Sequence, residues 1–312
     1  RSSEAGPGSR SRSPWSATRR TGPPRRRSSR PWSARSTPTR TYLVIHLGDI
    51  KSGSTVCSDA YFGFVAGLFS TFADPLVYTP GDNEWTDCHR ANNGGYLPTE
   101  RLARVRDVFF PRPGATLGQR TMRVQSQARQ GFPENQLWLR SGVVFSAVHV
   151  VGSNNDLAPW GTLEAGNTAL REAEYASRLQ ADLAWLDRTF RLAEEENAKA
   201  VVLAMQADMW DAFSVANGLP LNGFDPIVQR IADRAAAFGK PVLILQGDSH
   251  GFLVDQPLAS GSPVHHVTTA APNVTRIVVE GAQTVDEWLR LEVDPRGRAA
   301  TPFASERVVF TP

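Results

Sequence analysis

The run Tyr42–Leu43–Val44–Ile45–His46–Leu47–Gly48–Asp49 is a short apolar segment that ends in a glycine and a carboxylate. The same ending recurs at Gly81 and Asp82, after residues 76–80, and again at Gly247 and Asp248, after residues 242–246. Short apolar runs bounded by turn residues predict buried strands. Because ligands of layered α/β proteins bind at the edge where such strands end, we predict a site centred on Asp49.

The charge is distributed unevenly along the 312 residues. Residues 1–40 contain eleven of the 34 basic residues and one of the 31 acidic residues, which leaves 23 basic and 30 acidic residues for the rest. This balance argues against a nucleic-acid-binding surface on the core. No apolar run is long enough to cross a bilayer, and no signal peptide is visible. The oligomeric state cannot be derived from these features.

Residues 1–40 are rich in Arg, Ser and Pro and contain no Leu, Ile, Val, Phe or Met. Such a segment cannot bury a core, so we predict a disordered tail followed by one domain at 41–312. One interpretation is a basic tail that binds nucleic acid or anionic lipid. The other is a sequence without selected structure, such as a misassigned reading frame, and the abrupt change at Thr41 favours it.

From residue 41 the pattern alternates between strands and helices, which predicts the α/β class. Helices are expected at 58–73, 99–108, 168–197 and 225–239, the last with Asp225 as its cap. Strands are expected at 76–79, 143–151, 201–205 and 242–246, and then at 274–280, 287–293 and 307–310. The helix at 168–197 is the clearest, because five apolar residues recur at helical spacing: Leu179, Leu183, Leu186, Phe190 and Ala193. Residues 85–140 are interpreted as an irregular lid or substrate wall.

Polar residues follow the ends of the predicted strands. They are Asp49, Asp82, Asn83, Glu84, Asn154, Asn155, Gln206, Asp208, Asp248 and His250. One Gly-Asp pair is only a common turn, but several in one α/β chain point to a metal site. Oxygen donors with a single imidazole suit divalent Mn, Mg, Ca or Fe.

The order of these motifs resembles the calcineurin-like metallophosphoesterases over residues 41–256. Gly48–Asp49 is similar to the second block of that family, and Gly81–Asp82–Asn83–Glu84 to the third. Gln206 stands near the fourth, and Gly247–Asp248–Ser249–His250 is similar to the fifth. The resemblance implies a four-layer αββα sandwich with two metals at the C-terminal edge of the strands. Residues 274–312 would add further strands.

The metal ligands that the resemblance implies are Asp49, Asp82, Asp248, His250 and either Gln206 or Asp208. Asp49 would bridge the two metals. Asn83, beside Asp82, stands where the family has its catalytic histidine. An amide donates a hydrogen bond but cannot serve as a general acid near neutral pH.

The family's first block, Asp-x-His, is missing upstream of Asp49. The first metal would then keep only Asp49 and His250. The implied function is hydrolysis of a small-molecule phosphoester by a water activated between two metals, impaired by the missing block. The alternative is an inactive phosphoesterase-like binding module or a truncated product. A serine hydrolase built on Gly247–Asp248–Ser249 is a weaker rival, because no Asp-x-x-His follows.

Substrate contacts are expected from His89, Arg90 and Asn154, with Trp85 in the same loop region. Arg90 suits a phosphate oxygen. Among the other histidines, His46 and His149 lie inside apolar runs and are interpreted as core residues. His265 and His266 are interpreted as solvated, without carboxylate partners.

Two cysteines, Cys57 and Cys88, follow the first two Gly-Asp strand ends. If those strands are neighbours, the pair can form a disulfide across the rim of the site, and the alternative is two free thiols. A disulfide would favour an extracytoplasmic location.

Overall fold

The computed structural model describes residues 42–281, 287–294 and 301–309. Within these ranges the chain is a mixed α/β protein, as the sequence predicts. The predicted tail at residues 1–40 and the end of the last predicted strand at residue 310 lie outside the described residues.

The largest sheet has seven strands, which are β3 (Gln125–Gln127), β4 (Phe132–Arg140), β5 (Val143–Ala147), β6 (Ala200–Ala204), β7 (Val242–Gln246), β8 (Leu253–Asp255) and β9 (Val274–Val278). Their spatial order is β3-β4-β5-β6-β7-β9-β8. The strands β5, β6, β7 and β9 are parallel, whereas β3, β4 and β8 pair antiparallel. All residues of β5, β6 and β7 are buried, as expected for parallel strands covered on both faces.

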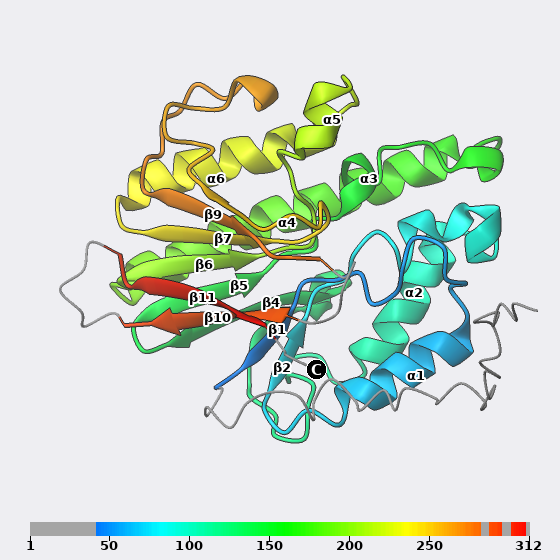
Figure 1. The fold of residues 1–312 in the computed structure, drawn as a ribbon, viewed down its shortest axis with the longest axis horizontal. Helices are drawn as coiled ribbons and strands as arrows, with labels where there is room; N and C mark the ends of the chain where they lie inside the picture. The colour runs from blue at the N-terminus through cyan, green and yellow to red at the C-terminus, as the bar shows by residue number, and fades with distance from the viewer. Residues whose placement is uncertain (1–41, 282–286, 295–300, 310–312) are drawn as a thin grey trace, which may run out of the picture.

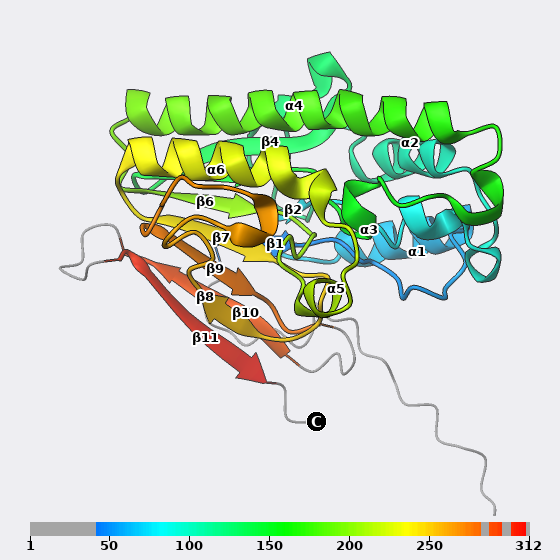
Figure 2. The same cartoon turned by 90° about the horizontal axis from the view of Figure 1, so that it is seen from above.

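Two small sheets pack against one face of the large sheet. One pairs β1 (Val44–His46) in parallel with β2 (Leu76–Tyr78), and the other pairs β10 (Glu287–Val293) antiparallel with β11 (Phe303–Val309). Ile45, Val77 and Leu291 from these sheets share a hydrophobic cluster with Phe145 and Val202 of the large sheet. Figure 2 shows β10 and β11 on the opposite side of the large sheet from the long helices.

The helices of the described residues are α1 (Asp59–Phe69), α2 (Pro98–Phe109), α3 (Gly152–Asn155), α4 (Thr168–Glu195), α5 (Ala212–Ala216) and α6 (Asp225–Phe238). The helices α4 and α6 cover the other face of the large sheet (Figure 1). Phe190 of α4 and Ile231 of α6 belong to the hydrophobic core on that face. The helices α1 and α2 pack on the small β1-β2 sheet through Phe62, Tyr78 and Phe109. None of these described helices combines the length and the apolar character needed to cross a membrane.

The predicted face of α4 is confirmed. Leu186, Phe190 and Ala193 are buried, and Leu179 and Leu183 are partly buried against the same core. The helix is 28 residues long, so one apolar stripe can cover several strands of the sheet.

Two predictions around α6 are wrong. Asp225 does not cap the helix; its carboxylate Oδ1 lies 2.8 Å from Nδ1 of His265 instead. His265 is consequently buried and paired, and its Nε2 lies 2.8 Å from the carbonyl oxygen of Met209. The partners are far apart in the sequence, which gives no sign of the contact. The predicted helix end at Gly239 is correct, with a left-handed φ of 65°.

Within residues 85–140 the predicted helix at 99–108 is confirmed as α2, but the interpretation of the remainder as irregular is wrong. The nine-residue strand β4 lies there and joins the large sheet beside β5. The buried residues Glu134, Asn135 and Gln136 of β4 are polar and hide the strand pattern. The short strand β8 was likewise not predicted.

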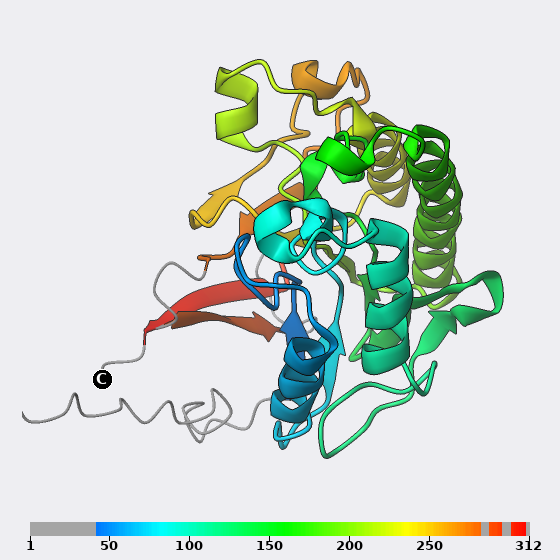
Figure 3. The same ribbon diagram turned by 90° about the vertical axis from the view of Figure 1, so that its right-hand side faces the viewer.

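The parallel strands end at a common edge, which faces the viewer in Figure 3. Past their ends, the amide of Gly247 donates to the carbonyl of Gln206 at 2.9 Å, and that of Ala207 donates to Val150 at 3.1 Å. The loops after β5, β6 and β7 are therefore joined by backbone hydrogen bonds. Side-chain contacts described below bring the ends of β1 and β2 to the same place.

Candidate metal centre

Three carboxylates meet at this edge of the sheet. Asp49 follows β1, Asp82 follows β2 and Asp248 follows β7, and one oxygen of each lies within 4.8 Å of the others. Asp49 and Asp248 have left-handed backbone φ angles of 55° and 67°. Such angles are uncommon outside glycine and gather at functional sites. We call these three residues the acidic triad.

Two glycines make the close packing of the triad possible. A Cβ atom at Gly81 would lie 2.3 Å from Asp49 Oδ1. A Cβ atom at Gly152 would lie 2.5 Å from Asp82 Oδ2 and 2.7 Å from Asp248 Oδ2. Any larger residue at either position would displace the carboxylates, so the backbone itself forms two walls of the site.

Gln206, which follows β6, orients the triad. Its Oε1 accepts a hydrogen bond of 2.7 Å from the amide of Gly152, which fixes the direction of the side-chain amide. Its Nε2 then donates to Asp49 Oδ2 at 3.2 Å and to Asp82 Oδ1 at 3.0 Å. This arrangement differs from the predicted ligand role, because an amide NH₂ has no lone pair for a metal.

The other predicted ligands lie outside the triad. The carboxylate of Asp208 pairs with Arg276 and accepts a hydrogen bond of 2.7 Å from Ser249 Oγ. His250 is exposed, packs against Gly281 and does not belong to the group of three carboxylates. Ser249 donates to a carboxylate and not to a histidine, so the serine-hydrolase alternative gains no support.

Burial and mutual repulsion act on the triad. Burial, followed by neighbouring negative charges, raises the pKa of Asp49 well above its ordinary value; those charges are Asp82, Glu84 and Asp248. Burial and then Asp82 raise the pKa of Asp248 in the same direction. None of the three carboxylates forms an ion pair among the described residues. A divalent cation would relieve this repulsion.

Asn83 and Glu84 shape the loop that carries Asp82. The backbone amide of Asn83 donates to Asp49 Oδ1 at 3.4 Å. Glu84 is fully buried, and its Oε1 accepts from the amide of Gly81 at 2.6 Å and from the hydroxyl of Tyr78 at 2.7 Å. The backbone of Asn83 thus lies beside the triad and Glu84 holds the turn, while the catalytic role of the Asn83 side chain stays a prediction.

Of the predicted substrate residues, Arg90 lies near the rim of the site. It pairs with Asp87 at 2.7 Å, its side chain is 46% exposed, and a Cβ at Gly53 would be close to both Arg90 and Asn83. Nδ1 of His89 lies 2.6 Å from the carbonyl oxygen of Thr86.

Asn154 and Trp85 turn away from the triad. The amide group of Asn154 donates to Asn222 Oδ1 at 3.1 Å and accepts from the amide of Gly223 at 2.8 Å. Trp85 is fully buried beside Leu102, so it cannot contact a substrate.

Two residues near the site were missed. Lys51 is only 4% exposed, and its Nζ donates to the carbonyl of Ser52 at 3.0 Å. Burial lowers the pKa of Lys51, and the acidic residues around it oppose this change. Ser153 Oγ lies 3.0 Å from Asp82 Oδ2 and 2.9 Å from Asp87 Oδ1. The signals in the sequence were a lysine two residues past Asp49 and the small polar run after β5.

A disulfide joins the loops that carry the first two aspartates. Cys57 and Cys88 are bonded, with their Cα atoms 5.9 Å apart. This is one of the two alternatives that the sequence left open. The bond ties the segment after Asp49 to the segment after Asp82.

The donor set of the triad fits one hard cation. Three carboxylates without sulfur or nitrogen ligands suit Mg²⁺, Mn²⁺ or Ca²⁺. In the described part of the chain, no second group of three acidic, histidine or cysteine ligands is brought together. The prediction of a second metal therefore stays a prediction.

Comparison with known proteins assigns no family to the chain. No protein-family model matches the chain, and no curated protein matches it.

Proposed function

We propose that this chain is a metal-dependent phosphoester hydrolase. The observation that carries the proposal is the acidic triad of Asp49, Asp82 and Asp248 at the C-terminal edge of parallel strands. Asp82 is buried and Asp49 and Asp248 are half-buried, so three like charges packed this closely destabilise a fold unless protons or a cation neutralise them. A site that persists at this cost indicates a function for the bound cation.

The layers of the fold support a metallophosphoesterase-like αββα arrangement. The helices α4 and α6 lie on one side of the large sheet, and the small sheets lie on its other face. The helices α1 and α2 pack outside the β1-β2 sheet. The order of helix, sheet, sheet and helix is that of the family the motifs resemble.

The roles of the residues follow from their positions. Asp49, Asp82 and Asp248 would hold the cation, and Gln206 keeps two of these carboxylates oriented. When bound, a divalent cation supplies an activated water and neutralises charge on phosphate oxygens. Arg90 at the rim offers a positive charge to a phosphoester.

Hydrolysis of a chromogenic aryl phosphate by the full chain in Mn²⁺ tests this function. We expect turnover that disappears in EDTA and in Asp49→Asn, because either change removes the bound cation. The matched control is Asp233→Asn, an exposed aspartate on α6 that should leave turnover unchanged. Equal turnover in wild type and Asp49→Asn would contradict the proposal.

A cation-binding module without turnover is the second candidate. It is favoured by the amide of Gln206, which faces the carboxylates where a metal ligand was predicted, and by the position of His250 outside the triad. This candidate predicts one bound Mn²⁺ per chain and no hydrolysis of the aryl phosphate. The two measurements together separate the candidates.

A further inference from the structure

Four consecutive residues after Gly152 adopt left-handed backbone angles. The φ angles of Ser153, Asn154, Asn155 and Asp156 are 53°, 54°, 56° and 64°. L-residues visit this region singly, and Asn and Asp tolerate it best. A run of four requires surrounding contacts that impose it. We call residues 153–156 the left-handed turn; it overlaps the short element α3, whose residues Ser153 and Asn154 do not have right-handed helical angles.

The left-handed turn contacts the triad through its first residues. The amide of Gly152 fixes Gln206, and Gln206 in turn donates to Asp49 and Asp82. The hydroxyl of Ser153 lies against the carboxylate of Asp82 at 3.0 Å. The position of two triad carboxylates therefore depends on the conformation of this turn.

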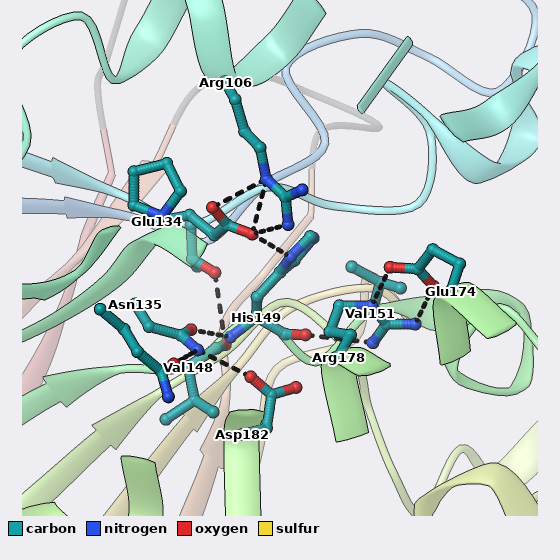
Figure 4. A network of polar contacts seen from close by, with 12 residues as sticks. Arg106, Glu134, Asn135, Val148, His149, Val151, Glu174, Arg178 and Asp182 are labelled. Carbon is teal, nitrogen blue, oxygen red and sulfur yellow. Dashed lines mark hydrogen bonds and ion pairs between the residues drawn. The ribbon is translucent and has the colours of Figure 1, made fainter. Parts of the chain in front are cut away.

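A single buried arginine on α4 holds the turn. Arg178 is fully buried, and its Nη2 donates to the carbonyl of Asn155 at 2.9 Å. Its Nη1 donates to Asn155 Oδ1 and, at 3.2 Å, to the carbonyl of His149. Glu174, one turn earlier on α4, pairs with the same guanidinium at 2.9 Å (Figure 4). The planar group thus binds the chain on both sides of Gly152.

Arg178 also contacts the loop of the second triad residue. Its guanidinium lies 5.3 Å from the ring centroid of Trp85, three residues past Asp82. One side chain therefore links the loop after β2 with the turn after β5. Arg178 itself contacts none of the three triad carboxylates in these interactions.

We propose that Arg178 is a positioning residue, which sets the geometry of the acidic triad through the left-handed turn. This inference rests on the proposed cation site at the triad. Lysine cannot replace the fork of donors, because its ammonium is a single point charge and cannot bind Asn155 and His149 together while lying on Trp85.

The test compares the full-length wild type with Arg178→Lys, which keeps the buried charge. Free Mn²⁺ is measured by electron paramagnetic resonance during a titration, and amide hydrogen exchange is followed at Gly152. We expect the variant to bind Mn²⁺ about 10-fold to 100-fold more weakly and to lose protection at Gly152. Asn155→Gly, which permits a positive φ but removes the partner amide, should act in the same direction and decides the matter if Arg178→Lys does not fold.

Arg230→Lys is the matched control. Arg230 pairs with Asp187 of α4 and donates to the carbonyl of Leu183, on a part of the helix beyond Arg178. The variant Arg230→Lys should leave the dissociation constant for Mn²⁺ within roughly twofold of the wild-type value, even if the substitution lowers thermal stability. Mn²⁺ binding and Gly152 protection at wild-type levels in both Arg178→Lys and Asn155→Gly would overturn the proposal. If wild type binds no Mn²⁺, the proposed function fails, and exchange at Gly152 alone decides the role of Arg178.

Discussion

Two polar clusters of the molecule both contain carboxylates but differ in charge balance. In the acidic triad, Asp49, Asp82 and Asp248 lie together and form no ion pair among the described residues. In the cluster around His149, the carboxylate of Glu134 meets Nδ1 of that histidine at 2.8 Å and pairs with the guanidinium of Arg106 (Figure 4). We call the second cluster the histidine network.

This difference in charge balance distinguishes the proposed cation site from the histidine network. Burial alone would raise the pKa of Glu134, but Arg106 and His149 outweigh burial and hold it at about 2. At the triad nothing outweighs burial, and the pKa of Asp49 rises. Glu134 is thus compensated by its pairs, whereas a divalent cation would compensate the repelling charges of the triad. His149 is accordingly a core histidine, as predicted.

The largest effect is expected from breaking the histidine network. Glu134→Leu leaves the buried Nδ1 of His149 without an acceptor, so we expect a loss of about 3–5 kcal/mol in unfolding free energy. Urea denaturation measures it. The control is Glu306→Leu, which removes an exposed ion pair with Arg290 and should cost at most about 1 kcal/mol. Equal losses in the two variants would show that the network is not a paired core.

The disulfide gives the next effect, because it holds the two triad loops together. Replacing Cys57 and Cys88 by serine opens a loop with a sequence separation of 31 residues. Chain entropy predicts a loss of about 3–4 kcal/mol in unfolding free energy. Urea denaturation of the double variant, compared with the oxidised wild type, measures the loss. Unchanged stability would mean that packing alone holds these loops.

His46 is a half-buried histidine on β1 and represents a third kind of polar group. Its Nδ1 is buried without a partner, and the ring lies 5.1 Å from that of Phe69 and 5.9 Å from that of Tyr78. Burial lowers the pKa of His46 from 6.5 to about 4.

The sign of the pH effect follows from this lowered pKa. Between pH 6.5 and about 4 the unfolded chain binds a proton at His46 that the folded chain does not. Its contribution to stability is therefore complete above pH 6.5 and is lost as the pH falls, by about 3 kcal/mol in total. His46→Phe should remove this part of the pH dependence, measured by urea denaturation at several pH values. An unchanged pH dependence would contradict the assignment.

The smallest effect has the opposite sign. In EDTA, Asp248→Asn removes one of three repelling charges and should raise the unfolding free energy by on the order of 1 kcal/mol. Thermal unfolding of the variant and the wild type in EDTA measures the gain. A clear loss of stability would mean that Asp248 is paired within the fold like Glu134.

The sequence predicted the triad because each member follows an apolar run that ends in Gly-Asp. The ends of neighbouring parallel strands meet, which places Asp49 beside Asp82. Asp248 follows β7 of the other sheet, so its place in the site depends on how the two sheets pack. The roles of Gln206 and Asp208 could not be predicted, because they depend on distant partners. The backbone amide of Gly152 orients the side chain of Gln206, and Arg276 forms an ion pair with Asp208.

The parts of the fold that were not predicted also depend on partners that are distant in the sequence. Strand β4 reads as polar at Glu134 and Asn135, yet these side chains are satisfied by His149 and by Asp182 of α4. The left-handed turn is imposed by Arg178, which lies more than twenty residues away in the sequence. Periodicity reports local burial and not such long-range pairing.

The most direct test of the account is the effect of Mn²⁺ on unfolding of the full chain. At a concentration about 100 times its dissociation constant, Mn²⁺ should raise the unfolding free energy of wild type by about 2.7 kcal/mol relative to EDTA. Asp49→Asn should show no increase, because it removes a carboxylate of the triad. Equal Mn²⁺ stabilisation of both proteins, or none in wild type, would contradict the claim that the triad is a cation site.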